Sequence, residues 1–124
     1  MEKTNFDSQS AIEKLKSLMT MLRDKNFGCP WDLEQTIASL VPYTLEEAYE
    51  VVDAIEKADM VELEDELGDL LFQVVFYAQI AKEQGLFQFD DVANAITKKL
   101  IRRHPHVFPE GKVTNFGSKS EISS

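Results

Sequence analysis

Apolar residues recur every three or four positions along most of this chain, a spacing typical of helices that bury one face. The first such pattern covers residues 8–23 and predicts an amphipathic helix, with Asp7 or Ser8 as its N-cap. The apolar stripe of this helix consists of Ile12, Leu15, Leu18, Met19 and Leu22.

The central part of the chain predicts two further helices, joined by a turn of a few residues. A capping box at Thr44–Glu47 opens the first helix, which runs to about Lys57. Asp59 caps the second helix, which covers residues 60–84 and ends at Gly85. Because so short a connection forces antiparallel neighbours, we expect a helical hairpin here.

The second hairpin helix is apolar around nearly its whole circumference between Leu67 and Ala81. Such a helix is buried on all sides, and a chain of 124 residues has too few helices to surround it. We therefore expect a homodimer or a dimer of dimers built on this helix. Gly68 has low helix propensity, and we expect it to allow a close helix approach beside the acids.

The segments before the hairpin carry loop and helix-breaking signals. Gly28, Pro30 and their polar neighbours predict a loop over residues 24–36. Residues 35–40 predict a short helix that Pro42 ends.

A last helix is predicted over residues 91–103, with Asp90 as its N-cap and the prolines beyond it as its stop. The fold class is therefore all-α, an antiparallel bundle of four to five helices. We expect one domain over residues 1–108 and a polar, mobile tail over residues 109–124. The buried stripe of the last helix would consist of Val92, Ala95, Ile96 and Leu100.

Acidic residues lie at matched spacing on the two hairpin helices, as Glu46-Glu47-x-x-Glu50 and Glu66-x-x-Asp69. At ~1.5 Å per residue, both pairs lie roughly 14–15 Å from the turn, so they are level across the hairpin. Four facing carboxylates repel each other, and a hard divalent cation with oxygen ligands relieves that repulsion. We predict a Mg²⁺ site, with Mn²⁺ as a possible substitute, formed by Glu47, Glu50, Glu66 and Asp69.

Iron and zinc sites require ligands that these two helices lack. Di-iron bundles need Glu-x-x-His pairs, whereas His104 and His106 both follow the last helix. Zinc sites favour Cys and His ligands. A single acidic motif is most often only a solvated helix face, and a partner-binding bundle without any metal stays open as an interpretation.

Two further features are candidates for substrate binding, and each is also compatible with a purely structural role. Trp31 is either an aromatic plug over the core or a stacking wall for a nucleobase. A basic cluster ends the last helix, where cations also suit the helix dipole. Its members that we consider for phosphate binding are Lys99, Arg102 and Arg103.

Composition limits the partners of the chain. The net charge of −9 does not favour binding along a nucleic-acid polymer. Cys29 is the single cysteine, which suits a reducing compartment, and no apolar signal core precedes residue 11. The most apolar run is too short and too polar to span a membrane. We expect a cytoplasmic protein without membrane partners.

Four sequence blocks in order give the chain a family resemblance. They are CPWD, PYTLEEAYEVVDAI, ELEDELGDLLFQVVFYAQIA and KLIRRHPHVF, between Cys29 and Phe108. Together they resemble the MazG family, and in particular the N-terminal half of its two-domain bacterial members. The resemblance implies an all-α nucleoside triphosphate pyrophosphohydrolase, which forms a nucleoside monophosphate and pyrophosphate with Mg²⁺.

The resemblance also implies roles for particular residues. Glu47, Glu50, Glu66 and Asp69 match the metal ligands of the family, and Glu46 matches the acid that supports them by orienting the attacking water. Lys99 and Arg103 fall where the catalytic domains of the family place phosphate-binding cations.

Two functions stay open under this resemblance. The first is a house-cleaning enzyme with broad or modified-nucleotide specificity. The second is a non-catalytic dimerisation or regulatory module with a metal site, because the N-terminal copy of the family is often regarded as less active. The sequence names no base or sugar preference.

Overall fold

The computed structural model describes residues 3–113, with side chains from residue 6 onward. Within these residues the regular structure is entirely helical, which confirms the predicted all-α class. The chain divides into two compact units between Gln88 and Phe89. Between residues 3 and 113, two 3-10 turns, η1 (Ala38–Leu40) and η2 (Pro109–Gly111), accompany six α-helices. The α-helices are α1 (Lys3–Ser8), α2 (Ala11–Leu22), α3 (Pro30–Glu34), α4 (Val41–Glu56), α5 (Met60–Glu83) and α6 (Phe89–Arg103).

The first predicted helix begins at Ala11, three residues later than predicted, and a separate short helix precedes it, so the predicted caps are wrong. α1 ends at Ser8, and α2 starts after Ser10, which has extended backbone angles. The Ser10 hydroxyl accepts a hydrogen bond from the backbone N–H of Glu13 at 3.3 Å. Ser10 therefore has the capping role that the sequence pattern assigns to Asp7 or Ser8.

Two prolines start helices where the sequence pattern predicts a loop and a break. Pro30 opens α3 inside the predicted loop, and Pro42 lies in the first turn of α4. Proline fits this position because the first N–H groups of a helix have no partner within it. α4 therefore begins at Val41, and Thr44 is not its cap.

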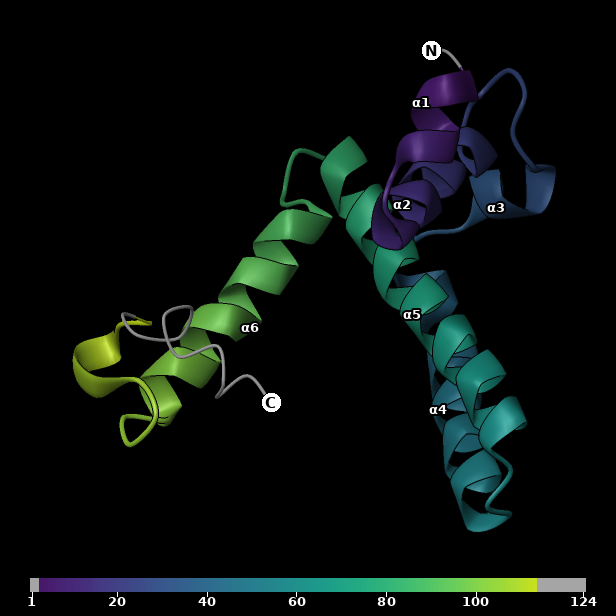
Figure 1. The fold of residues 1–124 in the computed structure, drawn as a ribbon. Helices are drawn as coiled ribbons and strands as arrows, with labels where there is room; N and C mark the ends of the chain where they lie inside the picture. The colour runs from purple at the N-terminus through teal and green to yellow at the C-terminus, as the bar shows by residue number, and fades with distance from the viewer. Residues whose placement is uncertain (1–2, 114–124) are drawn as a thin grey trace. The chain divides into compact units, whose positions relative to one another are not determined.

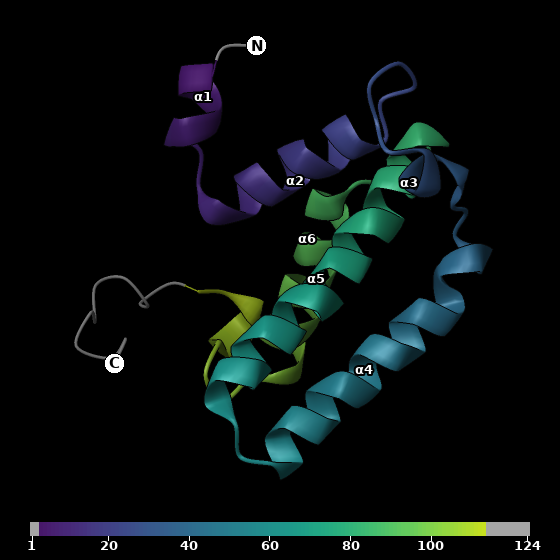
Figure 2. The ribbon, with the colours of Figure 1, turned by 90° about the vertical axis from the view of Figure 1, so that its right-hand side faces the viewer.

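The predicted hairpin is confirmed. α4 and α5 lie side by side and run in opposite directions in both views of the ribbon (Figures 1 and 2). The turn between them has Ala58 in the left-handed region at φ +56°. The Asp59 side chain then accepts a hydrogen bond from the N–H of Glu62 at 3.0 Å, which makes it the predicted cap of α5.

The core of the first unit lies around the C-terminal half of α5, where α2 packs against this helix. Phe76 and Ile80 of α5, Met19 of α2 and Leu40 of η1 are its largest fully buried side chains. Burying a side chain of this size contributes about 2 kcal/mol. This packing holds the C-terminal half of α5, and so the hairpin, in one place.

The apolar stripe of α4 does not face α5. Ala54 is buried and Val51 is half-buried, whereas the other apolar residues of α4 are exposed in the single chain. α5 is likewise open along part of its circumference, and its buried residues lie in its C-terminal half. The exposed apolar residues of α4 include Val41, Tyr43, Leu45, Ala48, Tyr49, Val52 and Ile55, and those of α5 include Leu67, Leu71 and Val74.

In the second unit, α6 starts at Phe89, two residues before the predicted start, so Asp90 lies inside the helix. No residue of α6 is buried, and its predicted stripe is therefore wrong for the single chain. The helix ends at Arg103, before Pro105, as predicted. Residues 114–124 of the predicted tail lie outside the described residues, and the division into a domain and a tail stays a prediction.

No helix within the described part of the chain is long and apolar enough to cross a membrane.

Candidate functional site

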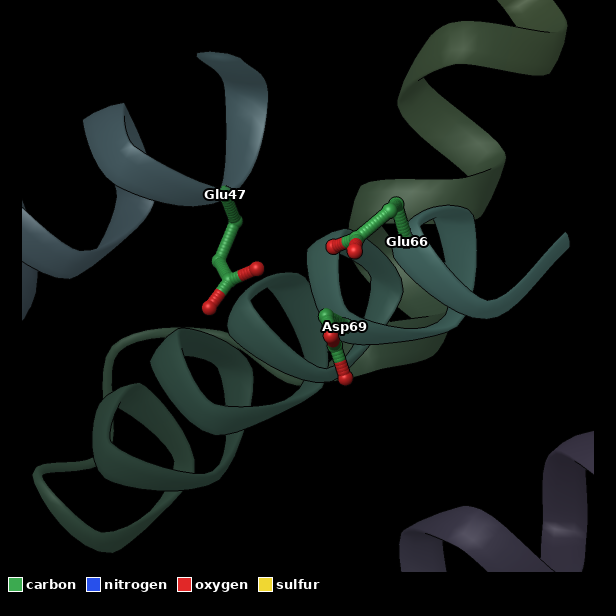
Figure 3. A group of neighbouring side chains, drawn as sticks. All are labelled: Glu47, Glu66 and Asp69. Atoms are coloured by element: carbon green, nitrogen blue, oxygen red, sulfur yellow. The ribbon is translucent and has the colours of Figure 1, made fainter. Parts of the chain in front are cut away.

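The hairpin brings acids from both helices to one place. Glu47 of α4 and Glu66 and Asp69 of α5 each offer a carboxylate oxygen, and these oxygens all lie within 4.8 Å of one another. Figure 3 shows Glu47 reaching from α4 toward α5, with the carboxylate of Glu66 turned toward it. The register predicted from helix rise is therefore confirmed.

A second group of carboxylates shares one member with the first. Glu50, Glu62 and Glu66 also offer oxygens within 4.8 Å of one another. The sequence analysis did not assign Glu62 to this site, because the Asp59–Glu62 segment is the capping signature that starts the helix. The spacing could have revealed it, since Glu62 and Glu66 are four apart on α5 and share a face.

A polar contact fixes the register of the hairpin beside these acids. The Thr44 hydroxyl of α4 lies 2.9 Å from Oε1 of Gln73 and 2.5 Å from the Tyr77 hydroxyl, both on α5. The Thr44 hydroxyl has one proton, which it can donate to Gln73 or to the backbone carbonyl of Leu40 at 3.2 Å, and either hydroxyl of the Thr44–Tyr77 pair can be the donor. Thr44 and Gln73 are one helical turn from Glu47 and Asp69 respectively, so this contact holds the two acid-bearing turns together.

The pKa values of two acids reflect this crowding. Burial raises the pKa of Glu47 above its ordinary value, and the negative charges of Asp69, Glu46 and Glu50 raise it further. Burial likewise raises the pKa of Glu66, followed by the charges of Glu50, Asp69, Glu47 and Asp65. Both groups therefore lack compensating positive charge.

Among the residues that the structure describes, no Lys, Arg or His side chain forms an ion pair with Glu47, Glu66 or Asp69. Lys57 is bound instead to Asp53 at 2.9 Å and lies 3.9 Å from Glu62. The first group thus offers only oxygen donors without a cationic partner. This donor set fits a hard divalent cation such as Mg²⁺.

An open, acidic groove of about 670 Å³ runs beside the site along α5. Gly68 lines it, and a Cβ atom added there would meet no other atom within 4 Å. Within the described residues no helix therefore approaches closely at Gly68, and the expected close approach stays a prediction for an assembly of chains. The other residues lining the groove are Asp59, Val61, Glu62, Glu64, Asp65 and Asp69.

Trp31 is both packed and open. Its ring meets Tyr43 of α4 edge-on at 5.4 Å between centroids and Phe76 of α5 at 6.4 Å. The residue is nevertheless 45% exposed. It therefore covers the core with one side and presents the other to solvent, so both interpretations from the sequence remain compatible.

The remaining predicted site residues are all exposed. Glu46 of α4 belongs to neither carboxylate group, although its charge acts on Glu47. Lys99, Arg102 and Arg103 lie on α6, in the second unit. The roles of these four residues stay predictions.

Comparison with known proteins gives consistent matches. Residues 35–108 match the MazG nucleotide pyrophosphohydrolase domain. The chain is 59% identical over 104 residues to a nucleoside triphosphate pyrophosphohydrolase of Escherichia coli K12, which covers 84% of the chain and 40% of the relative. It is 52% identical over 113 residues to the nucleoside triphosphate pyrophosphohydrolase/pyrophosphatase MazG of Thermotoga maritima. This alignment covers 91% of the chain and 44% of the relative.

A more distant relative has a name of the same kind. The chain is 44% identical over 103 residues to a nucleoside triphosphate pyrophosphohydrolase of Mycobacterium tuberculosis, covering 82% of the chain and 31% of the relative. The chain thus spans less than half the length of each of these three relatives. The family match covers more than half of the chain and includes both acid-bearing helices. The chain therefore belongs to the MazG nucleotide pyrophosphohydrolase domain family.

Proposed function

We propose that this chain hydrolyses nucleoside triphosphates to nucleoside monophosphates and pyrophosphate with a divalent cation. Its biological task would be house-cleaning, with broad or modified-nucleotide specificity. The observation that supports this proposal most is the convergence of Glu47, Glu66 and Asp69 without a cationic partner among the described residues. The names of the full-length relatives point to the same reaction.

In this proposal, Glu47, Glu50, Glu66 and Asp69 hold the cation, which is Mg²⁺ with Mn²⁺ as a substitute. When bound, the cation neutralises phosphate charge and lowers the pKa of a water molecule. Glu46, next to Glu47 on α4, would orient the attacking water. The reaction adds water across the bond between the α- and β-phosphates and releases pyrophosphate.

Further residues of the chain would bind the nucleotide. The open side of Trp31 offers a flat aromatic surface on which a base can stack, and stacking of this kind accepts every base. Lys99, Arg102 and Arg103 would bind phosphate oxygens. Arginine suits that task because its planar guanidinium group can donate two parallel hydrogen bonds to a phosphate.

A second candidate function is a dimerisation or regulatory module that binds a metal without catalysis. One observation favours it: α4 and α5 carry exposed apolar residues that a partner can cover. Under either function we propose that a second copy covers these residues, in a homodimer or a dimer of dimers.

Pyrophosphate release from a panel of canonical and modified nucleoside triphosphates tests the proposal. We expect release with Mg²⁺ or Mn²⁺ and none with EDTA. Asp69→Asn should lower the rate by more than about 100-fold, since even outer partners of metal ligands contribute 10- to 100-fold. Glu64→Gln is the matched control, because Glu64 is exposed on α5 and belongs to neither carboxylate group. A folded wild-type protein that releases no pyrophosphate would favour the module instead.

A further inference from the structure

Arg23 at the end of α2 connects three helices through one guanidinium group. Its Nε and Nη2 donate to the carboxylate of Glu83 on α5, at 3.1 and 2.5 Å. Its Nη1 donates to the backbone carbonyls of Asp32 and Gln35, at 2.7 and 3.0 Å. The side chain is only 9% exposed. Arg23 therefore uses most of its donors on fixed partners inside the first unit.

The two carbonyls belong to the end of α3, the five-residue helix that carries Trp31. So short a helix is not stable alone. Within this helix and its C-cap, the Asp32 carbonyl accepts only a long hydrogen bond of 3.4 Å, from the N–H of Gln35, and the Gln35 carbonyl lies beyond the last turn. Cys29 at its start provides no side-chain cap. Arg23 thus supplies from outside the hydrogen bonds that α3 lacks.

Trp31 and Arg23 also share a neighbour. The ring of Phe76 meets Trp31 at 6.4 Å, and the guanidinium carbon of Arg23 lies 5.9 Å from the centroid of the same ring. Phe76 is fully buried. Displacing Arg23 would therefore release the end of α3 and also alter the surface on which Trp31 rests.

The other end of this connection is itself fixed. Nε2 of Gln79, one turn earlier on α5, donates to Glu83 at 3.1 Å. The hydrogen bond from Arg23 lowers the pKa of Glu83 below its ordinary value, so Glu83 is ionised over the whole neutral range. The Arg23–Glu83 ion pair therefore stays charged at every pH in that range.

We propose that Arg23, anchored by Glu83, is a positioning residue that fixes Trp31 as the wall against which the base of the nucleotide stacks. This inference rests on the proposed function for the identity of the ligand. A wall fixed before the ligand arrives lowers the conformational entropy that binding costs. Loss of Arg23 should therefore weaken nucleotide binding while the carboxylates of the hairpin still carry out hydrolysis.

Trp31 is the single tryptophan, so intrinsic tryptophan fluorescence reports on this residue alone. The first variant is Arg23→Lys, which keeps the charge but has three donors on one nitrogen, whereas Arg23 makes four hydrogen bonds from three nitrogens. The second, milder variant is Glu83→Gln. Glu13→Gln is the matched control, because it breaks the exposed Glu13–Lys16 pair on α2, the helix that Arg23 ends. Far-UV circular dichroism establishes that each variant is folded.

In the ligand-free protein we expect Arg23→Lys to increase acrylamide quenching of Trp31 and to lower its fluorescence anisotropy. The KM for nucleoside triphosphates should rise about three- to tenfold, the equivalent of ordering one or two side chains, with kcat within about twofold. Glu83→Gln should show smaller changes in the same direction, and Glu13→Gln none.

A folded Arg23→Lys variant with unchanged quenching, anisotropy and KM would overturn the inference. An equal rise of KM in Glu13→Gln would overturn it too, because the effect would then be general. If the wild-type protein hydrolyses no nucleotide, the proposed function fails separately. The fluorescence comparison then still decides whether Arg23 positions Trp31.

Discussion

Glu66 is the residue on which both groups of carboxylates depend. It shares one group with Glu47 and Asp69 and the other with Glu50 and Glu62. Burial and the surrounding negative charges raise its pKa, which means that the folded chain disfavours its ionised form. The negative charges around Glu66 therefore destabilise the fold at neutral pH, and a bound cation would relieve that repulsion.

This repulsion predicts the pH dependence of stability in metal-free buffer. The pKa values of Glu47 and Glu66 are raised on folding. Their contribution to the free energy of unfolding is therefore complete below the ordinary pKa of 4.5 and is lost as the pH rises through the raised pKa values. Urea unfolding should therefore give a free energy of unfolding that falls as pH rises above about 4.5. Glu66→Gln should flatten this fall, and Glu64→Gln should not.

A wild-type stability that rises over the same pH window would contradict this account. Glu83 does not confuse the result, because its pKa is lowered and its effect is confined to pH values below 4.5. A divalent cation at a concentration of 100 times its dissociation constant should raise the free energy of unfolding by about 2.7 kcal/mol and so reverse the fall.

At the scale of residues, the sequence predicted the positions of the main acids but not the contacts of Arg23. Helix spacing and rise placed Glu47 opposite Glu66 and Asp69, because both quantities are fixed by backbone geometry. The contacts of Arg23 with Asp32, Gln35 and Glu83 could not be predicted, since they depend on tertiary packing between residues up to 60 positions apart.

At the scale of elements, the hairpin of α4 and α5 is the part that local signals determine most fully. The short turn and the Asp59 cap define it. The starts of α3 and α4 were missed because Pro30 and Pro42 are compatible with either a break or a first turn, and only the surrounding structure selects one. The N-terminal division at Ser10 was missed for a similar reason, since several residues there can cap a helix.

Gly68 gives a direct test of how α5 is packed. It lies inside the helix with a negative φ, and a Cβ atom there would meet nothing within 4 Å in the single chain. Gly68→Ala should therefore raise the free energy of unfolding by about 1 kcal/mol, measured by urea unfolding. Destabilisation instead would mean that another helix approaches Gly68 in an assembly, as the sequence pattern predicts.

At the scale of the whole molecule, the amount of exposed apolar surface on helices α4, α5 and α6 is the main feature. Leu45, Val52 and Ile55 of α4 are each about half exposed, and no residue of α6 is buried. The sequence predicted a fully buried α5 and a buried stripe on α6, and the single chain leaves apolar residues of both helices open. Exposed stripes of this kind mark protein–protein contacts more often than free surface.

Val52→Glu tests whether a second copy covers α4. The residue is exposed in the single chain, so a charge should not unfold the monomer, whereas burying that charge in an interface is costly. Sedimentation equilibrium should give a dimer or a dimer of dimers for the wild type and a folded monomer for the variant. Asn26→Glu, on the exposed loop before α3, is the charge-matched control and should keep the wild-type state. A stable wild-type monomer would contradict the assembly.

The claim on which the whole account depends is that the facing carboxylates of α4 and α5 bind a divalent cation. Mn²⁺ binding followed by electron paramagnetic resonance measures this without requiring turnover or a particular substrate. We predict that the wild type and Glu64→Gln bind Mn²⁺ alike, and that Asp69→Asn binds at least about tenfold more weakly, because it loses one charged oxygen ligand. Equal binding by Asp69→Asn, or no binding by a folded wild-type protein, would contradict the account.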